Sequence, residues 1–231
     1  MKAPSIDHLR RIALEAQGLT RSSPFGRGTG GAERALEQLG YVQIDTISVV
    51  SRAHHHTLYN RIPGYQPKLL DKLVAERRAF EYWFHAAAYL PMRDYRYALP
   101  RMRRFKRGEM RWMRSRDQKL MDQVLDRIRF DGPLRARDFE DPSHKHGGWW
   151  DWKPAKRALE QLFMQGDLMV AAREGFQKTY DLPERVLPAG VDTRIPSQIS
   201  SARRFTPSIL IDSLAACRVS RSNDTSLIAS A

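Results

Sequence analysis

The sequence predicts a mainly α protein of the α+β class, built from tandem winged helix-turn-helix domains with short β-hairpin wings. Two observations lead to this prediction. In the second half of the chain, three predicted helices are followed by a β-hairpin, which is the winged-helix arrangement, and the first half is compatible with a helix-turn-helix. We place the first domain at 1–110, the second at 111–196, and a poorly ordered or aberrant tail at 197–231.

The first half opens with two predicted helices. The segment "SIDHLRRIALEAQGL" has apolar residues on one helical face, with Ser5 or Asp7 as its cap and Gly18 as its stop. A loop, "RSSPFGRGTGG", separates it from the short helix "AERALEQL", which ends at Gly40. The segment "YVQIDTISVV" follows and is typical of a strand, because it is rich in β-branched residues.

The remainder of the first half is predicted from periodicity, with one ambiguity. The segments "SRAHHHTLYNRI" and "KLLDKLVAERR" favour helices on either side of a turn at "PGYQP". The run "AFEYWFHAAAYLP" fits either a strand or a buried helix, since its period does not decide. A helical region then starts at Arg93 and is interrupted near Pro100.

The second half has a clearer layout. We predict an amphipathic helix over "QKLMDQVLDRIRF" and a short second helix over "GPLRARDFE". A third helix covers "KPAKRALEQLFMQ", with Pro154 in its first turn and Gly166 as its stop. The segments "DLMVAA" and "FQKTYDL" then form a hairpin around Gly175.

The third helix of this half is the predicted DNA-reading element. In a winged-helix domain this helix enters the major groove while its apolar face packs inward. Its outward-facing basic residues are the candidate DNA contacts: Lys153, Lys156 and Arg157.

The charge balance indicates a polyanionic partner. Lys plus Arg number 39 against 26 for Asp plus Glu, a net charge of +13 and a pI near 10.2. Nucleic acid is the first candidate and an anionic membrane surface the second. No run is apolar enough to span a membrane, and no lipid-facing amphipathic segment supports the membrane alternative. The single cysteine, Cys217, excludes an intrachain disulfide and fits a reducing cytoplasm.

Two polar residues in an apolar strand are the candidate catalytic pair. Gln43 and Asp45 are two positions apart, so on a strand they share one face while Ile44 points to the other. A carboxylate there can take a proton from water or stabilise a cation, and a carboxamide can orient that water. The structural alternative is that Asp45 caps the next helix or pairs with an arginine such as Arg52.

A longer match surrounds this pair. The strings "GYVQIDTISVVSRAHHHTLYNRIPGY", "FEYWFHAAAYLP" and "ERVLPAGVDTRIP" resemble the YcaQ–AlkZ family of winged-helix DNA glycosylases, over about Ile6 to Pro196. The family's catalytic signature is Gln, an aliphatic residue, then Gln or Asp, here Gln43-Ile44-Asp45. The resemblance implies a monofunctional DNA repair glycosylase that removes N7-alkylated purines, unhooks interstrand crosslinks and leaves an abasic site.

The chemistry implied by the resemblance is compatible with a single carboxylate. An N7-alkylated purine is already cationic and leaves as a neutral base, so the acid that sugar hydrolases usually need can be absent. Asp45 would stabilise the oxocarbenium-like sugar or activate water, and Gln43 would position that water. We expect no metal and no cofactor. The expected enzyme is a bacterial, cytoplasmic monomer, associated with the nucleoid during repair, whose partner is alkylated or crosslinked double-stranded DNA.

Further DNA contacts are expected around the catalytic pair. Neighbouring residues of a helix point about 100° apart, so the triple histidine cannot converge on one metal ion. The histidines could face DNA, or one could be buried and hydrogen-bonded, and the flanking arginines could meet phosphates. Tyr82, Trp83 and His85 could line the cleft near the lesion, since aromatic faces stack on bases, or Tyr82, Trp83 and Phe84 could simply be core. The predicted DNA-binding residues here are Arg52, His54, His55, His56, Arg61, Trp83 and His85.

The family pattern is expected to break near Pro196. Members usually continue into a third winged-helix domain and a β-rich domain, so we expect this chain to be C-terminally shortened. Two alternatives to an active enzyme therefore stay open: a non-catalytic winged-helix DNA-binding protein acting as a regulator, and an inactive truncated relic.

Overall fold

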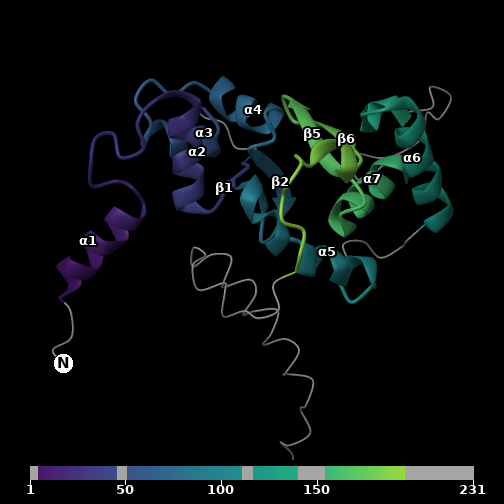
Figure 1. Ribbon diagram of the computed structural model, residues 1–231, viewed down its shortest axis with the longest axis horizontal. Helices are drawn as coiled ribbons and strands as arrows, with labels where there is room; N and C mark the ends of the chain where they lie inside the picture. The colour runs from purple at the N-terminus through teal and green to yellow at the C-terminus, as the bar shows by residue number, and fades with distance from the viewer. Residues whose placement is uncertain (1–4, 46–50, 111–116, 140–153, 196–231) are drawn as a thin grey trace, which may run out of the picture.

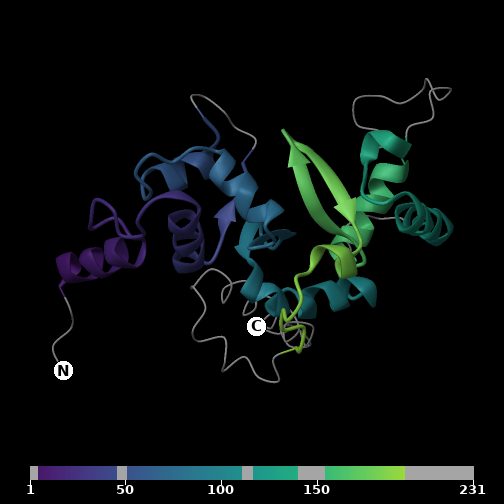
Figure 2. The same ribbon diagram turned by 45° about the horizontal axis from the view of Figure 1, so that its top comes forward.

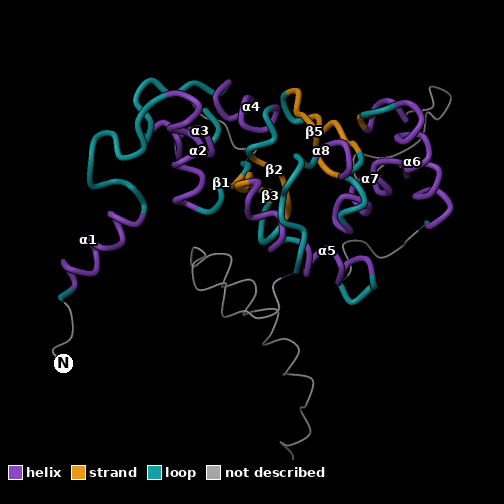
Figure 3. Tube along the Cα trace, viewed as in Figure 1, coloured by secondary structure: helices purple, strands orange, loops and turns teal. Residues whose placement is uncertain are grey.

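The computed structural model describes residues 5–45, 51–110, 117–139 and 154–195. Within these ranges the fold is a mixed α+β one, with two small antiparallel sheets of three strands each. The strands gather in the middle of the molecule and helices surround them, as Figures 1 and 3 show. The predicted mixture of helices with short strands is confirmed, and the winged-helix assignment stays a prediction.

Helix α1 (Ile6–Ala16) begins where the sequence predicts. Ser5 is its N-cap, and the Ser5 hydroxyl accepts a hydrogen bond from the His8 N–H at 3.2 Å. No residue of α1 is buried. The helix extends away from the rest of the described chain, as the two views in Figures 1 and 2 show.

Helix α2 (Gly28–Leu39) is longer than predicted, because it starts inside the predicted glycine-rich loop. Gly31 allows this, since a Cβ there would lie 2.8 Å from the Gly26 carbonyl oxygen. The helix ends at the predicted residue, Gly40, whose φ of 78° is left-handed.

The first sheet contains the strand that carries the candidate catalytic pair. Its strands are β1 (Val42–Gln43), β2 (Ala79–Trp83) and β3 (Ala87–Pro91), in the order β1-β3-β2. The ambiguous aromatic run is therefore a hairpin, with its turn at residues 84–86. Helices α3 (Ala53–Tyr59) and α4 (Lys68–Ala75) confirm the two helices predicted there.

The helical region after Arg93 is also interrupted as predicted. It consists of the 3-10 helix η1 (Met92–Tyr97) and α5 (Leu99–Lys106), with Pro100 in the first turn of α5. Proline is tolerated there because the first turn of a helix needs no N–H donor from it.

The second half holds the other sheet, β4-β6-β5. Its elements are α6 (Gln118–Asp131), β4 (Leu134–Arg135), the 3-10 helix η2 (Ala136–Phe139), α7 (Pro154–Gln165), β5 (Met169–Glu174), β6 (Gln177–Asp181) and α8 (Pro183–Val186). The predicted first and third helices and the hairpin at Gly175 are confirmed, Gly175 having a φ of 60°.

The predicted short helix over "GPLRARDFE" is largely wrong. Leu134 pairs with Tyr180 of β6, and Arg135 with Thr179. The Asp138 carboxylate also accepts a hydrogen bond from the Arg135 N–H at 2.7 Å, which closes a local turn. Cross-strand pairing therefore outweighs helical preference in this segment.

The first sheet separates two hydrophobic clusters. Leu36, Leu58 and Leu73 pack with Val42 and Tyr89 on one side of it. On the other side, alternate residues of β2 and β3 join one cluster with residues of α5, α6, α7 and the second sheet: Phe80, Tyr82, Ala88, Leu90, Met102, Val124, Leu159, Phe163 and Tyr180. This cluster extends across the predicted boundary at residue 110, and the boundary itself stays a prediction.

None of the helices in the described ranges has the length and apolar character that a membrane span requires.

Candidate functional site

Strand β1 gives the candidate catalytic pair its geometry. Val42 is buried and Ile44 packs against the same cluster, while Gln43 is exposed and Asp45 is half-buried. The alternation is maintained past the strand, because the Ile44 N–H donates to the Ala87 carbonyl at 2.7 Å. This agrees with the expected arrangement of a core-facing Ile44 between two outward residues. The other two predicted core residues of this segment, Ile47 and Val49, lie outside the described residues.

The His54 ring contacts the backbone of Asp45. Its Nδ1 accepts a hydrogen bond from the Asp45 N–H at 3.4 Å, so the neutral ring carries its proton on Nε2. Only 5% of the residue is exposed. Burial, together with the charges of His55 and Arg52, lowers the pKa of His54 to about 4, so the ring is neutral at pH 7. The alternative reading, one buried and hydrogen-bonded histidine, describes His54.

The other two histidines of the triple have separate partners. The His55 Nδ1 is 2.9 Å from the Tyr65 hydroxyl, and burial lowers the pKa of His55. The His56 Nε2 is 3.0 Å from the Ser51 carbonyl on the exposed side of α3. In the ranges that the structure describes, no three His, Cys, Asp or Glu side chains form a possible metal site. The DNA contacts of these rings stay predictions.

Arg61 has a structural role that the sequence did not indicate. The residue is 7% exposed, and its guanidinium donates to the Gln17 carbonyl and the Thr57 carbonyl, both at 2.7 Å. A third bond reaches the Gln17 side chain at 3.3 Å. Arg61 thus ties the end of α1 to α3, and its predicted phosphate contact stays a prediction.

Arg52 is held by a residue from the other half of the chain. Its guanidinium carbon lies 3.5 Å from the centroid of the Phe176 ring, which sits at the tip of the β5–β6 hairpin. Arg52 is also the N-cap residue of α3, so Asp45 does not occupy that position, contrary to one alternative considered above. A signal for Phe176 exists in the sequence, an aromatic residue directly after the turn glycine, but nothing in it indicates Arg52 as the partner.

The residues of the aromatic run range from fully buried to exposed. Tyr82 is fully buried and its hydroxyl donates to the Met164 carbonyl at 2.8 Å, so it is a core residue. Trp83 is half-buried against the same core. His85 is exposed, with its ring edge-on to Tyr41 at 5.3 Å between centroids. Tyr41 and Gln43 are two positions apart, which brings His85 to the sheet face of Gln43.

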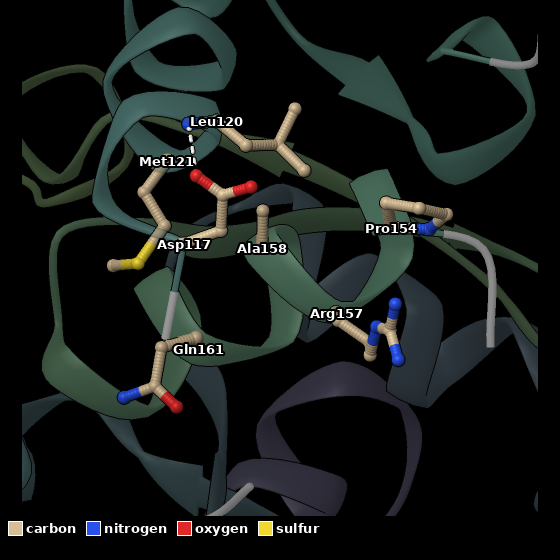
Figure 4. A pocket seen from close by; sticks show the side chains of 7 residues that line it. All are labelled: Asp117, Leu120, Met121, Pro154, Arg157, Ala158 and Gln161. Carbon is tan, nitrogen blue, oxygen red and sulfur yellow. Dashed lines mark hydrogen bonds between the residues drawn. The ribbon is translucent and has the colours of Figure 1, made fainter. Parts of the chain in front are cut away.

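Two of the three basic residues predicted to contact DNA in the second half lie on helix α7. Lys156 and Arg157 are exposed, and Lys153 lies outside the described residues. Arg157, Ala158 and Gln161 line a pocket of about 240 Å³ together with residues at the start of α6, as Figure 4 shows. There the Asp117 carboxylate accepts a hydrogen bond from the Leu120 N–H and so caps α6. Neither Gln43 nor Asp45 lines this pocket, so it is not the candidate catalytic site.

Comparison with known proteins connects these features to a family. The profile of a family described as "DNA glycosylase AlkZ-like" matches residues 36–218. Among solved structures, the DNA glycosylase AlkZ of Streptomyces sahachiroi is similar with a TM-score of 0.56 and 18% sequence identity. The similarity covers 92% of this chain and 57% of that one, so the chain spans little more than half of that relative. At this identity the likeness establishes the fold.

The family resemblance predicted from the sequence is confirmed, although the matched range differs at both ends from the predicted Ile6 to Pro196. The profile covers most of the 231 residues and includes Gln43 and Asp45. The chain therefore belongs to the AlkZ-like DNA glycosylase family.

Proposed function

We propose that the chain is a monofunctional DNA glycosylase that hydrolyses the N-glycosidic bond of N7-alkylated purines and unhooks interstrand crosslinks. The observation that carries the proposal is the alternation at β1, with Val42 and Ile44 in the core and Gln43 and Asp45 turned away from it. Family membership supplies the reaction class, since the matched range contains this pair.

The proposed reaction needs one carboxylate. A cationic N7-alkylpurine leaves with the bonding electrons and becomes neutral, so the developing positive charge falls on the sugar. Asp45 stabilises that charge and takes a proton from the attacking water, which Gln43 orients through its carboxamide. His54 supports Asp45 by accepting its backbone N–H. None of these steps requires a metal or a cofactor.

We further propose that both halves are winged-helix modules on duplex DNA. The α6–η2–α7 helices followed by the β5–β6 hairpin have the order of such a module. In this proposal Lys156 and Arg157 of α7 contact the DNA together with Lys153. The protein acts as a monomer on cytoplasmic DNA, with modules at 1–110 and 111–196 and residues 197–231 as a tail.

The proposal is tested by base release from a duplex that contains N7-methylguanine, with alkaline cleavage of the abasic sites formed. Asp45→Asn keeps the size of the side chain and removes its charge, and should lower the rate roughly a hundredfold or more. Asp126→Asn, an exposed residue on α6, is the matched control and should keep the wild-type rate. A wild-type protein that binds the duplex but releases no base would refute the proposed activity.

The second candidate is a DNA-binding protein without catalysis, either a regulator or an inactive relic. The net charge of +13 favours DNA binding whether or not Asp45 acts on a sugar. In that case Asp45→Asn would leave the affinity for duplex DNA nearly unchanged, and neither protein would produce abasic sites. The same assay, run with a binding measurement, separates the two candidates.

A further inference from the structure

We propose that Phe176 is a positioning residue that holds Arg52 in place for a phosphodiester group of the bound DNA strand. The proposal rests on the proposed function, because it concerns DNA held next to Asp45. Phe176 belongs to the β5–β6 hairpin and Arg52 to the first residues before α3, so the phosphate site requires both halves of the chain.

The hairpin tip is anchored before it meets Arg52. Arg173 donates to both carboxylate oxygens of Glu81, at 2.6 and 2.7 Å, and the Glu81 side chain is only 1% exposed. The same arginine donates to the Phe176 carbonyl at 3.3 Å. Glu81 lies on β2, in the sheet that also contains β1. The backbone of the hairpin tip at Phe176 is therefore tied to the sheet that contains the strand carrying Gln43.

The stacking geometry leaves Arg52 able to bind an anion. A guanidinium lying over an aromatic face uses its flat surface, so its N–H donors, which lie in the plane, stay available. Across the part of the chain that the structure describes, no carboxylate or carbonyl accepts a hydrogen bond from Arg52. The Phe176 ring at 3.5 Å thus orients the Arg52 guanidinium without using its N–H donors.

The chemistry of the site selects a phosphodiester. A planar fork with unused donors matches two oxygens of a phosphate in a bidentate contact. Arg52 is the N-cap residue of α3, two residues before His54, whose Nδ1 accepts the Asp45 N–H at 3.4 Å. We therefore place the backbone that flanks a lesion at the start of this helix. Arg52 would therefore fix the register of the strand, while Asp45 acts on the sugar.

A double-mutant cycle tests the proposal. Phe176→Ala, Arg52→Ala and the double variant are compared for the Kd of an N7-methylguanine duplex and for the single-turnover rate at saturating protein. Phe176→Ala should raise the Kd roughly threefold and Arg52→Ala roughly tenfold. Both should also lower the saturating rate, because the strand register is then less well fixed. Because Phe176 acts through Arg52, the double variant should match Arg52→Ala. Phe176→Tyr keeps an aromatic face and should restore the wild-type Kd.

The matched control is Phe130→Ala, another aromatic residue of the second half, which is 93% exposed and should leave the Kd unchanged. Losses that multiply in the double variant, or a Kd unaffected by Phe176→Ala, would overturn the proposal. Wild-type protein that releases no base refutes the proposed function instead. In that case the Kd pattern of the cycle still decides the phosphate site, so the two failures are distinguishable.

Discussion

Replacing His54 with Asn is expected to make the fold less sensitive to acid. Burial holds the pKa of His54 at about 4 in the folded protein, against 6.5 in the unfolded chain. The unfolded state therefore takes up the proton first. The stability associated with the neutral ring is complete above pH 6.5 and is lost progressively as the pH falls toward 4. A pKa difference of this size corresponds to about 3 kcal/mol of unfolding free energy.

Urea denaturation at pH 7.5, 5.5 and 4.5 measures this effect. Wild type should lose up to about 3 kcal/mol across the range from this ring alone, on top of losses shared with the variant. Asn can still accept the Asp45 N–H through its side-chain oxygen but does not titrate, so the pH slope of His54→Asn should be flatter. His56→Asn, an exposed neighbour on α3, serves as the control. Equal slopes for wild type and His54→Asn would refute the reasoning.

Three further substitutions test the packing around the site. Arg173→Met leaves the buried carboxylate of Glu81 without its main partner and should cost about 3–5 kcal/mol by urea unfolding; a loss below 1 kcal/mol would contradict this. Tyr82→Phe removes a buried 2.8 Å hydrogen bond and should lower the unfolding free energy by about 1 kcal/mol, whereas an unchanged Tm would contradict it. Gly166→Ala should cost at least about 1 kcal/mol, because φ is 77° and the new Cβ would lie 2.7 Å from a methionine sulfur; unchanged stability would argue against this.

Helices could be predicted from the sequence where only one face of the helix is buried. In α6 the buried residues Met121, Val124 and Ile128 follow a helical period, and Asp117 supplies a cap at the start. The β2–β3 hairpin lacks such a signal. Both faces of its strands are buried, so Phe80 and Ala79 are equally apolar although they belong to different clusters. Periodicity disappears when burial is two-sided, which is why the aromatic run could not be assigned.

The candidate site was predictable where its signal is local. The alternation of Gln43 and Asp45 with apolar neighbours is visible within four residues. The choice of His54 as the buried histidine is not, because it depends on how α3 packs against Tyr89, 6.1 Å away between ring centroids. The stacking of Phe176 on Arg52 depends on how a distant hairpin docks, and no local pattern encodes that.

The pair of Glu81 and Arg173 explains why the hairpin can act as part of the site. A buried ion pair contributes little more net stability than apolar residues of the same size, since both charges lose their hydration. Its two parallel hydrogen bonds do impose a direction, which an apolar contact cannot do. The consequence of this pair is thus a fixed angle between β5 and β2. Because Phe176 and Gln43 belong to the hairpin and the sheet that this pair joins, that angle sets the distance between Phe176 and Gln43.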